Sequence, residues 1–275
     1  MPETKVIALP NQKGGTGKTT TTVNLGAALA LMRKKVLLVD TDPQGNLTTS
    51  LGWHRHDKLD VTLTTHLRKL VEDEPFPPTE GILRHSEGFD LMPANIELSS
   101  MELGLVNAMS REHIMKLWLE SVKGGYDYVL VDCSSTLGML TINALTAADS
   151  IIIPVQAQYL PAKGMTELVK TIMRVKRQIN PELKIDGVLL TLVDARTNLA
   201  KQVERDIRRD YGSVLRVFDA RVPIAVRAAE ASAYGQSIFA YDRRGKVAEA
   251  YAALAKEVAS LGERKRTPSE PALAR

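Results

Sequence analysis

Cysteine is almost absent from this sequence, and long hydrophobic runs are missing altogether. The single cysteine, Cys133, excludes an internal disulfide and a metal site built from several cysteines. It directly follows a run of strand-forming residues, so we expect it to be a small side chain of the core. No apolar run approaches the ~18 residues of a membrane-spanning helix, and residues 151–153 (Ile-Ile-Ile) are long enough only for a buried strand.

We expect neither a targeting segment nor a repeat architecture. The first predicted strand begins at residue 5, which leaves no room for a signal peptide, and we find no internal repeat. The apolar content of 44% and the charged content of 25% are ordinary for a globular protein. The 275 residues are enough for one large α/β domain, which we expect to be cytoplasmic.

The chain lacks a strong net charge, but its charges are unevenly distributed. The formal net charge is +4. From residue 196 onward the chain contains 16 Lys and Arg against 10 Asp and Glu, whereas the preceding part carries a small excess of acid. The basic last third suits a polyanionic partner. An ordinary solvated face remains the alternative.

Apolar runs of strand length alternate with stretches of helical periodicity along the chain. This alternation predicts an α/β fold, with a single doubly wound, mostly parallel sheet and helices on both of its faces. The predicted strands cover residues 5–9, 35–39, 89–92, 126–131, 150–155, 184–192 and 214–218. The predicted helices cover residues 19–32, 97–106, 114–122, 137–147, 163–179, 199–211 and 245–261. The Pro- and Glu-rich residues 72–78 are predicted to form a surface loop.

A glycine-rich segment follows the first predicted strand. Residues 12–19 match the phosphate-binding P-loop pattern G-x-x-x-x-G-K-[ST], except that Gln12 replaces the first glycine. In such a strand–loop–helix unit, backbone N–H groups and the helix N-terminus bind phosphate oxygens. Lys18 is expected to reach the β- and γ-phosphates, and the Thr19 hydroxyl to bind Mg²⁺. The predicted nucleotide-binding residues are Lys13, Gly14, Gly15, Thr16, Gly17, Lys18, Thr19 and Thr20.

Lys13 is not required by the P-loop pattern. It lies five residues before Lys18 and cannot easily reach the same phosphates from the same loop. It is either a solvated surface lysine or a residue that points across a dimer interface to a nucleotide held by a partner. The residues themselves leave both possibilities open.

Acidic residues follow two of the predicted buried strands. Asp40 ends one predicted strand, Asp42 lies two residues later in the loop that follows, and Asp132 ends another predicted strand. Carboxylates at the carboxyl ends of parallel strands meet at one edge of the sheet, where a nucleotide site needs them for Mg²⁺ and water. We assign Mg²⁺ to Thr19, Asp42 and Asp132, and catalysis to Lys13, Lys18, Asp42 and Asp132. A strand-end Asp can also act as a helix cap or turn former.

Several segments resemble the ParA/MinD ATPases. Residues 11–21 (Asn-Gln-Lys-Gly-Gly-Thr-Gly-Lys-Thr-Thr-Thr) are similar to the deviant Walker A loop of the ParA/Soj branch, and residues 39–46 to its switch I motif. The resemblance implies ATP and Mg²⁺ as cofactors and an ATP-bound sandwich homodimer in which Lys13 is the signature lysine. It also implies that Asp42 positions the attacking water and that hydrolysis is stimulated by a ParB-like protein.

The resemblance extends from about residue 4 to residue 260. It predicts one P-loop ATPase domain over residues 1–262, followed by a disordered basic tail over residues 263–275. It further implies a DNA-segregation function for a chromosome or plasmid, with sequence-independent binding to double-stranded DNA on the nucleoid. Arg196 and Arg227 lie in segments that resemble DNA-contacting regions of the family.

Two departures from the family pattern concern the site. Ser134-Ser135 replaces a usual Pro-Pro in switch II, which loosens the loop and adds hydroxyl donors near the γ-phosphate. Pro223 remains where the family frames adenine, but the arginine that usually follows it is Ile224. Arg221, two residues before Pro223, is a candidate replacement for that DNA-contacting charge.

Three other functions share this loop. A membrane-cycling regulator of the MinD type needs a C-terminal amphipathic helix, but the tail contains prolines and no apolar stripe, so we expect no stable membrane binding. An electron donor like the nitrogenase iron protein needs cluster-binding cysteines, which Cys133 alone cannot supply. An ATPase that positions another cargo over the nucleoid would look the same in sequence.

Overall fold

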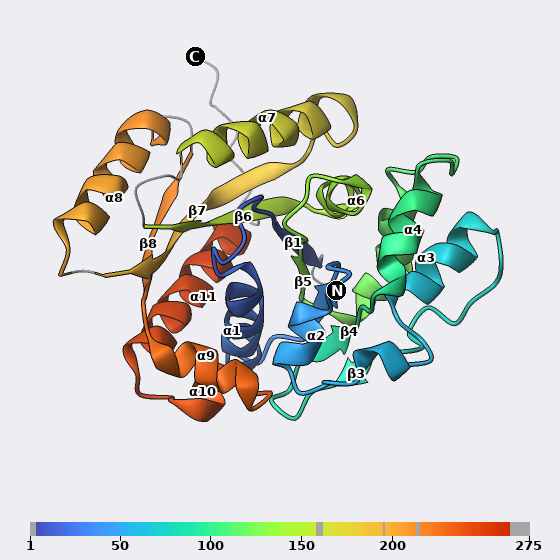
Figure 1. Ribbon diagram of the computed structural model, residues 1–275, viewed down its shortest axis with the longest axis horizontal. Helices are drawn as coiled ribbons and strands as arrows, with labels where there is room; N and C mark the ends of the chain where they lie inside the picture. The colour runs from blue at the N-terminus through green and yellow to red at the C-terminus, as the bar shows by residue number, and fades with distance from the viewer. Residues whose placement is uncertain (1–3, 158–161, 195, 213–214, 265–275) are drawn as a thin grey trace, which may run out of the picture.

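A mostly parallel sheet forms the centre of the molecule (Figure 1). The computed structural model describes residues 4–157, 162–194, 196–212 and 215–264, and within them the sheet has eight strands in the order β3-β4-β2-β5-β1-β6-β7-β8. Neighbouring strands are parallel except for the antiparallel pair β3 and β4. The strands are β1 (Lys5–Leu9), β2 (Val36–Asp40), β3 (Leu83–Arg84), β4 (Asp90–Met92), β5 (Tyr128–Asp132), β6 (Ser150–Gln156), β7 (Lys184–Val193) and β8 (Val217–Pro223). The predicted fold class is confirmed.

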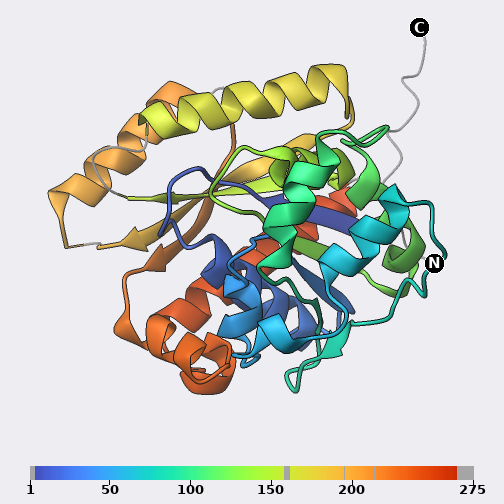
Figure 2. The same cartoon turned by 45° about the vertical axis from the view of Figure 1, so that its right-hand side comes forward.

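Helices cover both faces of the sheet, as Figures 1 and 2 show. One core lies under α3 (Leu63–Val71), α4 (Glu97–Leu105), α5 (Ile114–Val122), α6 (Met139–Ala147), α7 (Ala162–Gln178) and α8 (Asn198–Tyr211). The other core lies under α1 (Lys18–Leu31), α2 (Asn46–Ser50), α10 (Ile238–Tyr241) and α11 (Lys246–Arg264), with α9 (Val226–Ala233) beside them. Two 3₁₀ turns, η1 (His56–Lys58) and η2 (Lys123–Gly125), complete the elements.

Both faces of the central strands are buried, which explains their continuous apolar sequences. In β1, Val6 and Ala8 belong to one core and Ile7 and Leu9 to the other. Strands covered on both sides read as uninterrupted apolar runs, because every side chain leaves water. Cys133, directly after β5, is buried in the first core, as its position in the sequence predicted.

The carboxyl ends of the central strands lie level with one another. Asp132 at the end of β5 pairs in register with Leu9 at the end of β1 and with Asp40 at the end of β2. The segments that follow these three strands therefore leave the sheet at one edge. Open α/β sheets bind their ligands at this edge.

Four short helices were not predicted from the sequence. These are α2, α3, α9 and α10, of which α9 is rich in alanine and has no broad apolar stripe. The last strand lies later than predicted, at Val217–Pro223 instead of residues 214–218, and α11 ends at Arg264. Residues 72–78 form the predicted loop. The remainder of the predicted tail, residues 265–275, lies outside the described residues, and no helix in the described part is long and apolar enough to cross a membrane.

Candidate active site

The glycine-rich loop connects β1 to α1 and takes a backbone course that glycine permits. Gly15 and Gly17 have positive φ angles of 72° and 80°, which side-chain-bearing residues rarely adopt. A β-carbon added to Gly14 or Gly15 would meet no atom within 4 Å, so the loop is open on that side. Gly17 occupies the N-cap position and α1 begins at Lys18. The loop and the helix N-terminus together form a cradle of the kind that binds phosphate.

Side chains from other strands hold this loop from outside. Asn11 donates to a backbone carbonyl of β6 at 2.6 Å. Gln156, at the end of β6, donates to the Gly15 carbonyl at 3.1 Å, and Thr191 of β7 donates to the Thr16 carbonyl at 2.8 Å. The loop is therefore fixed before any ligand binds, which lowers the entropic cost of binding.

Lys18 is a buried cation that has no hydrogen-bonded anion among the residues that the structure describes. Its Nζ donates to the neutral Ser135 Oγ at 2.9 Å. Within the same described part of the chain, the buried Thr16 Oγ1 has no hydrogen-bond partner. A buried charge is costly unless it is paired. These two groups fit an anionic ligand such as the phosphates of a nucleotide.

Thr19 and Asp132 lie in direct contact. The Thr19 hydroxyl donates to Asp132 Oδ2 at 2.7 Å, and the Thr22 hydroxyl, one helical turn later, donates to Oδ1 at 3.2 Å. Hydroxyl and carboxylate oxygens are the ligands that Mg²⁺ prefers, directly or through water. Two of the three predicted Mg²⁺ residues are thus placed together, beside Lys18.

Burial changes the acidity of both strand-end carboxyl groups. Burial raises the pKa of Asp132 to about 7, and the negative charge of Asp40 adds to this effect, while the Thr19 hydrogen bond and the Lys18 charge oppose it. Burial likewise raises the pKa of Asp40 to about 6, against hydrogen bonds from Thr48. A cation bound beside these two carboxyl groups would stabilise their ionised forms.

Asp42 lies near this pair but faces its own loop. Its charge is among the influences that raise the pKa of Asp132. Its Oδ1 accepts a hydrogen bond from the Gln44 amide at 3.0 Å, and its own amide donates to Asp40 at 3.1 Å. Within the described residues it forms no hydrogen bond with Lys18 or Thr19. Its roles in binding Mg²⁺ and in positioning water stay predictions.

Lys13 lies on the outer surface of the loop. Its side chain is exposed and forms no ion pair with any residue that the structure describes. The backbone amide of Lys13 donates to Asn11 Oδ1 at 3.0 Å, which fixes where the lysine leaves the loop. This placement agrees with a side chain that reaches outward, and its role across an interface stays a prediction.

Comparison with known proteins gives this arrangement a family. The AAA domain family matches residues 4–185. The sporulation initiation inhibitor protein Soj of Bacillus subtilis (strain 168) is 46% identical over 260 residues, which cover 94% of this chain and 99% of the relative. The chromosome partitioning protein ParA of Caulobacter vibrioides (strain NA1000 / CB15N) is 41% identical over 258 residues, which cover 93% of this chain and 94% of the relative. This chain belongs to the ParA/Soj family.

A solved structure extends the comparison to ligands. Cobyrinic acid a,c-diamide synthase from Mycobacterium smegmatis, with a bound ATP analogue and magnesium, is 38% identical with a TM-score of 0.82, and the match covers 96% of each chain. That protein holds a nucleotide and Mg²⁺ on the same fold. The resemblance predicted from residues 11–21 and 39–46 is therefore confirmed at the level of family and fold.

The remaining predicted residues of this ParA/Soj chain lie on or near β7 and β8, the last two strands of the sheet order. Pro223 ends β8 and pairs with Val193 of β7, where it is half-buried. The three candidate DNA-binding arginines each pair with one carboxylate: Arg196 with Asp194 at 2.9 Å, Arg221 with Glu204 at 2.6 Å and Arg227 with Asp242 at 3.1 Å. The Asp194 hydrogen bond raises the pKa of Arg196 further. The guanidinium of Arg221 is thus directed to α8, which carries Glu204, and Ile224 is exposed to solvent.

Three functional contacts were missed in the sequence. Gln156 and Thr191 bond to the loop, and Thr22 bonds to Asp132, whereas Ser135 accepts the bond from Lys18. Gln156 and Thr191 stand at or near the carboxyl ends of parallel strands, a position that could have marked them. The hydroxyl groups at residues 134–135 were expected near the γ-phosphate, and the Ser135 contact agrees with that expectation.

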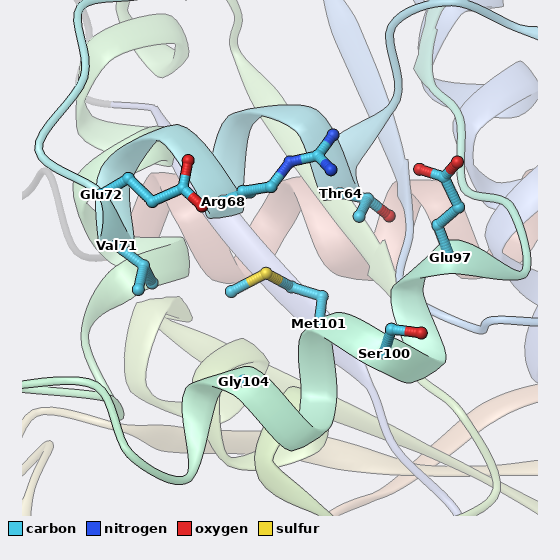
Figure 3. Close-up of a pocket in the computed structure, with 8 residues that line it drawn as sticks. All are labelled: Thr64, Arg68, Val71, Glu72, Glu97, Ser100, Met101 and Gly104. Atoms are coloured by element: carbon cyan, nitrogen blue, oxygen red, sulfur yellow. The ribbon is translucent and has the colours of Figure 1, made fainter.

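A separate cavity of about 410 Å³ lies between α3 and α4. Arg68 and Glu72 border it from α3, and Glu97 and Met101 border it from α4 (Figure 3). None of its lining residues belongs to the glycine-rich loop or to the segments that follow β2 and β5. It is therefore distinct from the phosphate cradle.

The raised pKa of Asp132 predicts a specific dependence of stability on pH. Without Mg²⁺ and nucleotide, the folded protein holds a proton on Asp132 up to a pKa of about 7, whereas the unfolded chain releases it near 3.8. The free energy of unfolding therefore falls as the pH rises from about 4 to about 7, by up to ~1.4 kcal/mol per pH unit for one proton. Asp132→Asn removes this contribution.

Urea unfolding followed by circular dichroism at several pH values measures the effect. The difference between wild type and Asp132→Asn isolates Asp132 from other titrating groups. Asp219→Asn, at an exposed carboxylate on β8, is the control and should retain the wild-type slope. Identical slopes in wild type and Asp132→Asn would contradict the prediction.

Proposed function

We propose that this protein is an ATP-dependent DNA-segregation ATPase. The observation that carries the proposal is the contact of Thr19 with Asp132 beside the buried, unpaired ammonium of Lys18. In the proposed cycle, Mg²⁺ and ATP bind at the loop, an ATP-bound homodimer forms and binds DNA without sequence preference, and hydrolysis releases it. The relatives named Soj and chromosome partitioning protein ParA support this reading.

Each residue of the site has a defined part in the proposed activity. ATP supplies the γ-phosphoryl group and Mg²⁺ offsets its charge. Backbone N–H groups of the loop and Lys18 bind the phosphates, while Thr19 and Asp132 hold the metal ion, with Asp42 as the third candidate. Asp42 orients the water that attacks the γ-phosphate. Lys18 has three donors, of which Ser135 takes one, so two remain for phosphate oxygens.

A partner stimulates hydrolysis in this proposal. No arginine lies in the glycine-rich loop or in the segments after β2 and β5. An arginine supplied by another protein accelerates P-loop enzymes by about 10³–10⁵-fold. We therefore propose a slow basal rate and a ParB-like partner, with the protein acting in the cytoplasm on the nucleoid.

The name of the Mycobacterium smegmatis structures describes another activity, the synthesis of a diamide of cobyrinic acid. That activity is not proposed for this chain. Segregation is favoured by the greater identity to Soj and ParA and by the exposed arginines along β7, β8 and α9. A ParA-like ATPase that positions another cargo uses the same nucleotide and DNA sites, and a ParB-like gene beside this one would favour segregation.

The two lysines of the loop predict separable defects. Lys18→Ala should abolish ATP binding, because the β- and γ-phosphates lose their buried counter-ion. Lys13→Ala should leave ATP binding to the monomer within about threefold, because Lys13 lies outside the cradle, and should remove the ATP-dependent dimer. Calorimetric titration measures binding, and size-exclusion chromatography with light scattering measures dimerisation. Equal loss of ATP binding in both variants would exclude a role of Lys13 across the interface.

Substitution of Asp42 is expected to trap the ATP-bound dimer. Asp42→Ala should bind ATP and dimerise, but hydrolysis should fall by about 10²–10⁴-fold, the range for a group that positions or activates a nucleophile. Chromatography with Mg²⁺ and ATP should then show a persistent dimer, whereas the wild-type dimer decays as ATP is consumed. A monomeric Asp42→Ala protein under these conditions would show that Asp42 serves assembly and not water positioning.

The DNA site in this proposal binds phosphates. Arg196, Arg221 and Arg227 are largely exposed, and exposed ion pairs contribute only about 0–1 kcal/mol. Phosphate oxygens can therefore displace their carboxylate partners at small cost. Figures 1 and 2 show the end of β7, the start of α8 and α9 on the same side of the molecule, and a two-fold dimer doubles the set.

Binding to DNA should depend on ATP and fall steeply with salt. In a plot of log affinity against log salt concentration, Arg196→Ala or Arg227→Ala should reduce the slope by about one to two units, one for each subunit's lost phosphate contact. Lys116→Ala, at an exposed lysine of α5, which packs against α3 and α6, should leave the slope unchanged. Interferometry on two unrelated duplexes measures this. Tight binding without nucleotide, or none with ATP at low salt, would overturn the DNA part of the proposal.

A further inference from the structure

The helices α9 and α10 form a hairpin that is joined within itself. Arg227, in the first turn of α9, pairs with Asp242 directly after α10 at 3.1 Å. The rings of Tyr234 and Tyr241 stack with their centroids 5.6 Å apart, and the Tyr241 hydroxyl donates to Glu230 at 3.0 Å. Arg227 is therefore connected to the end of α10 through its ion pair with Asp242.

One buried amide joins this hairpin to the helix that follows the glycine-rich loop. Asn24 of α1 is 4% exposed. Its Nδ2 donates to the Thr20 carbonyl at 2.7 Å, and its Oδ1 accepts the Ile238 amide, at the start of α10, at 2.7 Å. Thr20 lies in the first turn of α1, two residues after Lys18. Asn24 therefore connects the first turn of α1 to the start of α10.

The hairpin also touches the segment after β2, with no side chain between the two backbones. A β-carbon on Gly235, in the turn between α9 and α10, would lie 2.7 Å from the Gly52 Cα. Both glycines have positive φ angles, 68° and 96°. Gly52 follows α2, and α2 begins four residues after Asp42. The two backbones therefore lie so close that a β-carbon on Gly235 would not fit between them.

A third contact gives the hairpin a support on the sheet. Glu87, between β3 and β4, accepts hydrogen bonds from the amide of Ser237, at 2.8 Å, and from its hydroxyl. His85 contacts the Gly235 carbonyl at 3.2 Å. Figure 1 shows α9 and α10 beside α1 and α2. The hairpin thus contacts the turn between β3 and β4, helix α1 after the glycine-rich loop, and the end of the segment that carries α2.

We propose that Asn24 and the Gly52–Gly235 contact are positioning elements that pass the nucleotide state of the loop to Arg227 through the α9–α10 hairpin. The inference rests on the proposed function, in which ATP controls DNA binding, and adds the route of that control. It needs no rearrangement of the sheet. Because coupling between two ligands is reciprocal, DNA should raise the affinity for ATP by the same factor by which ATP raises the affinity for DNA.

Gly235→Ala tests the route, and Gly88→Ala is its matched control. Both positions have positive φ, but a β-carbon on Gly88 would meet no atom within 4 Å. The two variants therefore share the backbone strain, and only Gly235→Ala pushes the hairpin against Gly52. Asn24→Asp is a second variant, which keeps an acceptor for Ile238 and loses the donor to Thr20.

The first measurement is the coupling factor, from DNA affinity with and without a non-hydrolysable ATP analogue and from analogue affinity with and without duplex DNA. Wild type and Gly88→Ala should give the same factor in both directions, about 5–150-fold. In Gly235→Ala and Asn24→Asp the factor should fall to about twofold or less, while analogue affinity without DNA stays within about threefold of wild type. An unchanged factor in both variants would overturn the inference.

The second measurement does not depend on DNA. Hydrogen exchange followed by mass spectrometry reports the amides of residues 226–241 with and without Mg²⁺ and the analogue. Wild type and Gly88→Ala should change exchange in this segment, and Gly235→Ala and Asn24→Asp should not. If hydrogen exchange in residues 226–241 changes with the analogue in wild type but the protein does not bind DNA, the proposed coupling from the loop to the hairpin is supported and the DNA part of the proposed function is wrong. No response in wild type would overturn the route itself.

Discussion

Asp132 occupies the position on which the site depends. It ends a strand whose residues are buried on both faces, and it lies level with the ends of β1 and β2. Its carboxylate accepts hydrogen bonds from the hydroxyl groups of Thr19 and Thr22, in two successive turns of α1. Its backbone carbonyl accepts a hydrogen bond from the Thr41 hydroxyl at 2.7 Å. One residue thus connects the sheet, the helix after the glycine-rich loop and the loop after β2. The geometry of all three follows from the register of β5.

The burial of this carboxyl group has an electrostatic consequence. Burial raises the pKa of both Asp40 and Asp132, the Asp40 charge adds to the effect on Asp132, and the buried Lys18 ammonium nearby donates its hydrogen bond to the neutral Ser135 hydroxyl. A metal ion and a triphosphate together relieve both imbalances, because the cation compensates the carboxylates and the anion compensates the ammonium. Ligands that bind the folded state stabilise it, so the nucleotide contributes to the stability of the site as well as to its chemistry.

Short sequence patterns were sufficient to predict those site residues that lie within one contiguous segment. Lys18 and Thr19 belong to a contiguous sequence motif, and Asp132 ends an apolar run. All three residues could therefore be predicted from the sequence. Gln156 and Thr191 reach the loop from strands more than a hundred residues away, and only the strand order brings them there. The helices α9 and α10 were missed because α9 is rich in alanine and α10 has only four residues. Arg227 was recognised by resemblance, but its pairing with Asp242 needed the fold.

The lone cysteine has a practical consequence. Cys133 is 1% exposed, and burial raises the pKa of its thiol to about 12, with the Asp132 charge adding to the effect. The nucleophilic form of cysteine is the thiolate, so this thiol is inert to alkylating reagents and to mild oxidants while the protein is folded. The chain is therefore a natural single-label background. A cysteine introduced at an exposed position, such as Tyr234 on the hairpin, would carry a spectroscopic probe without removal of any native residue from the core.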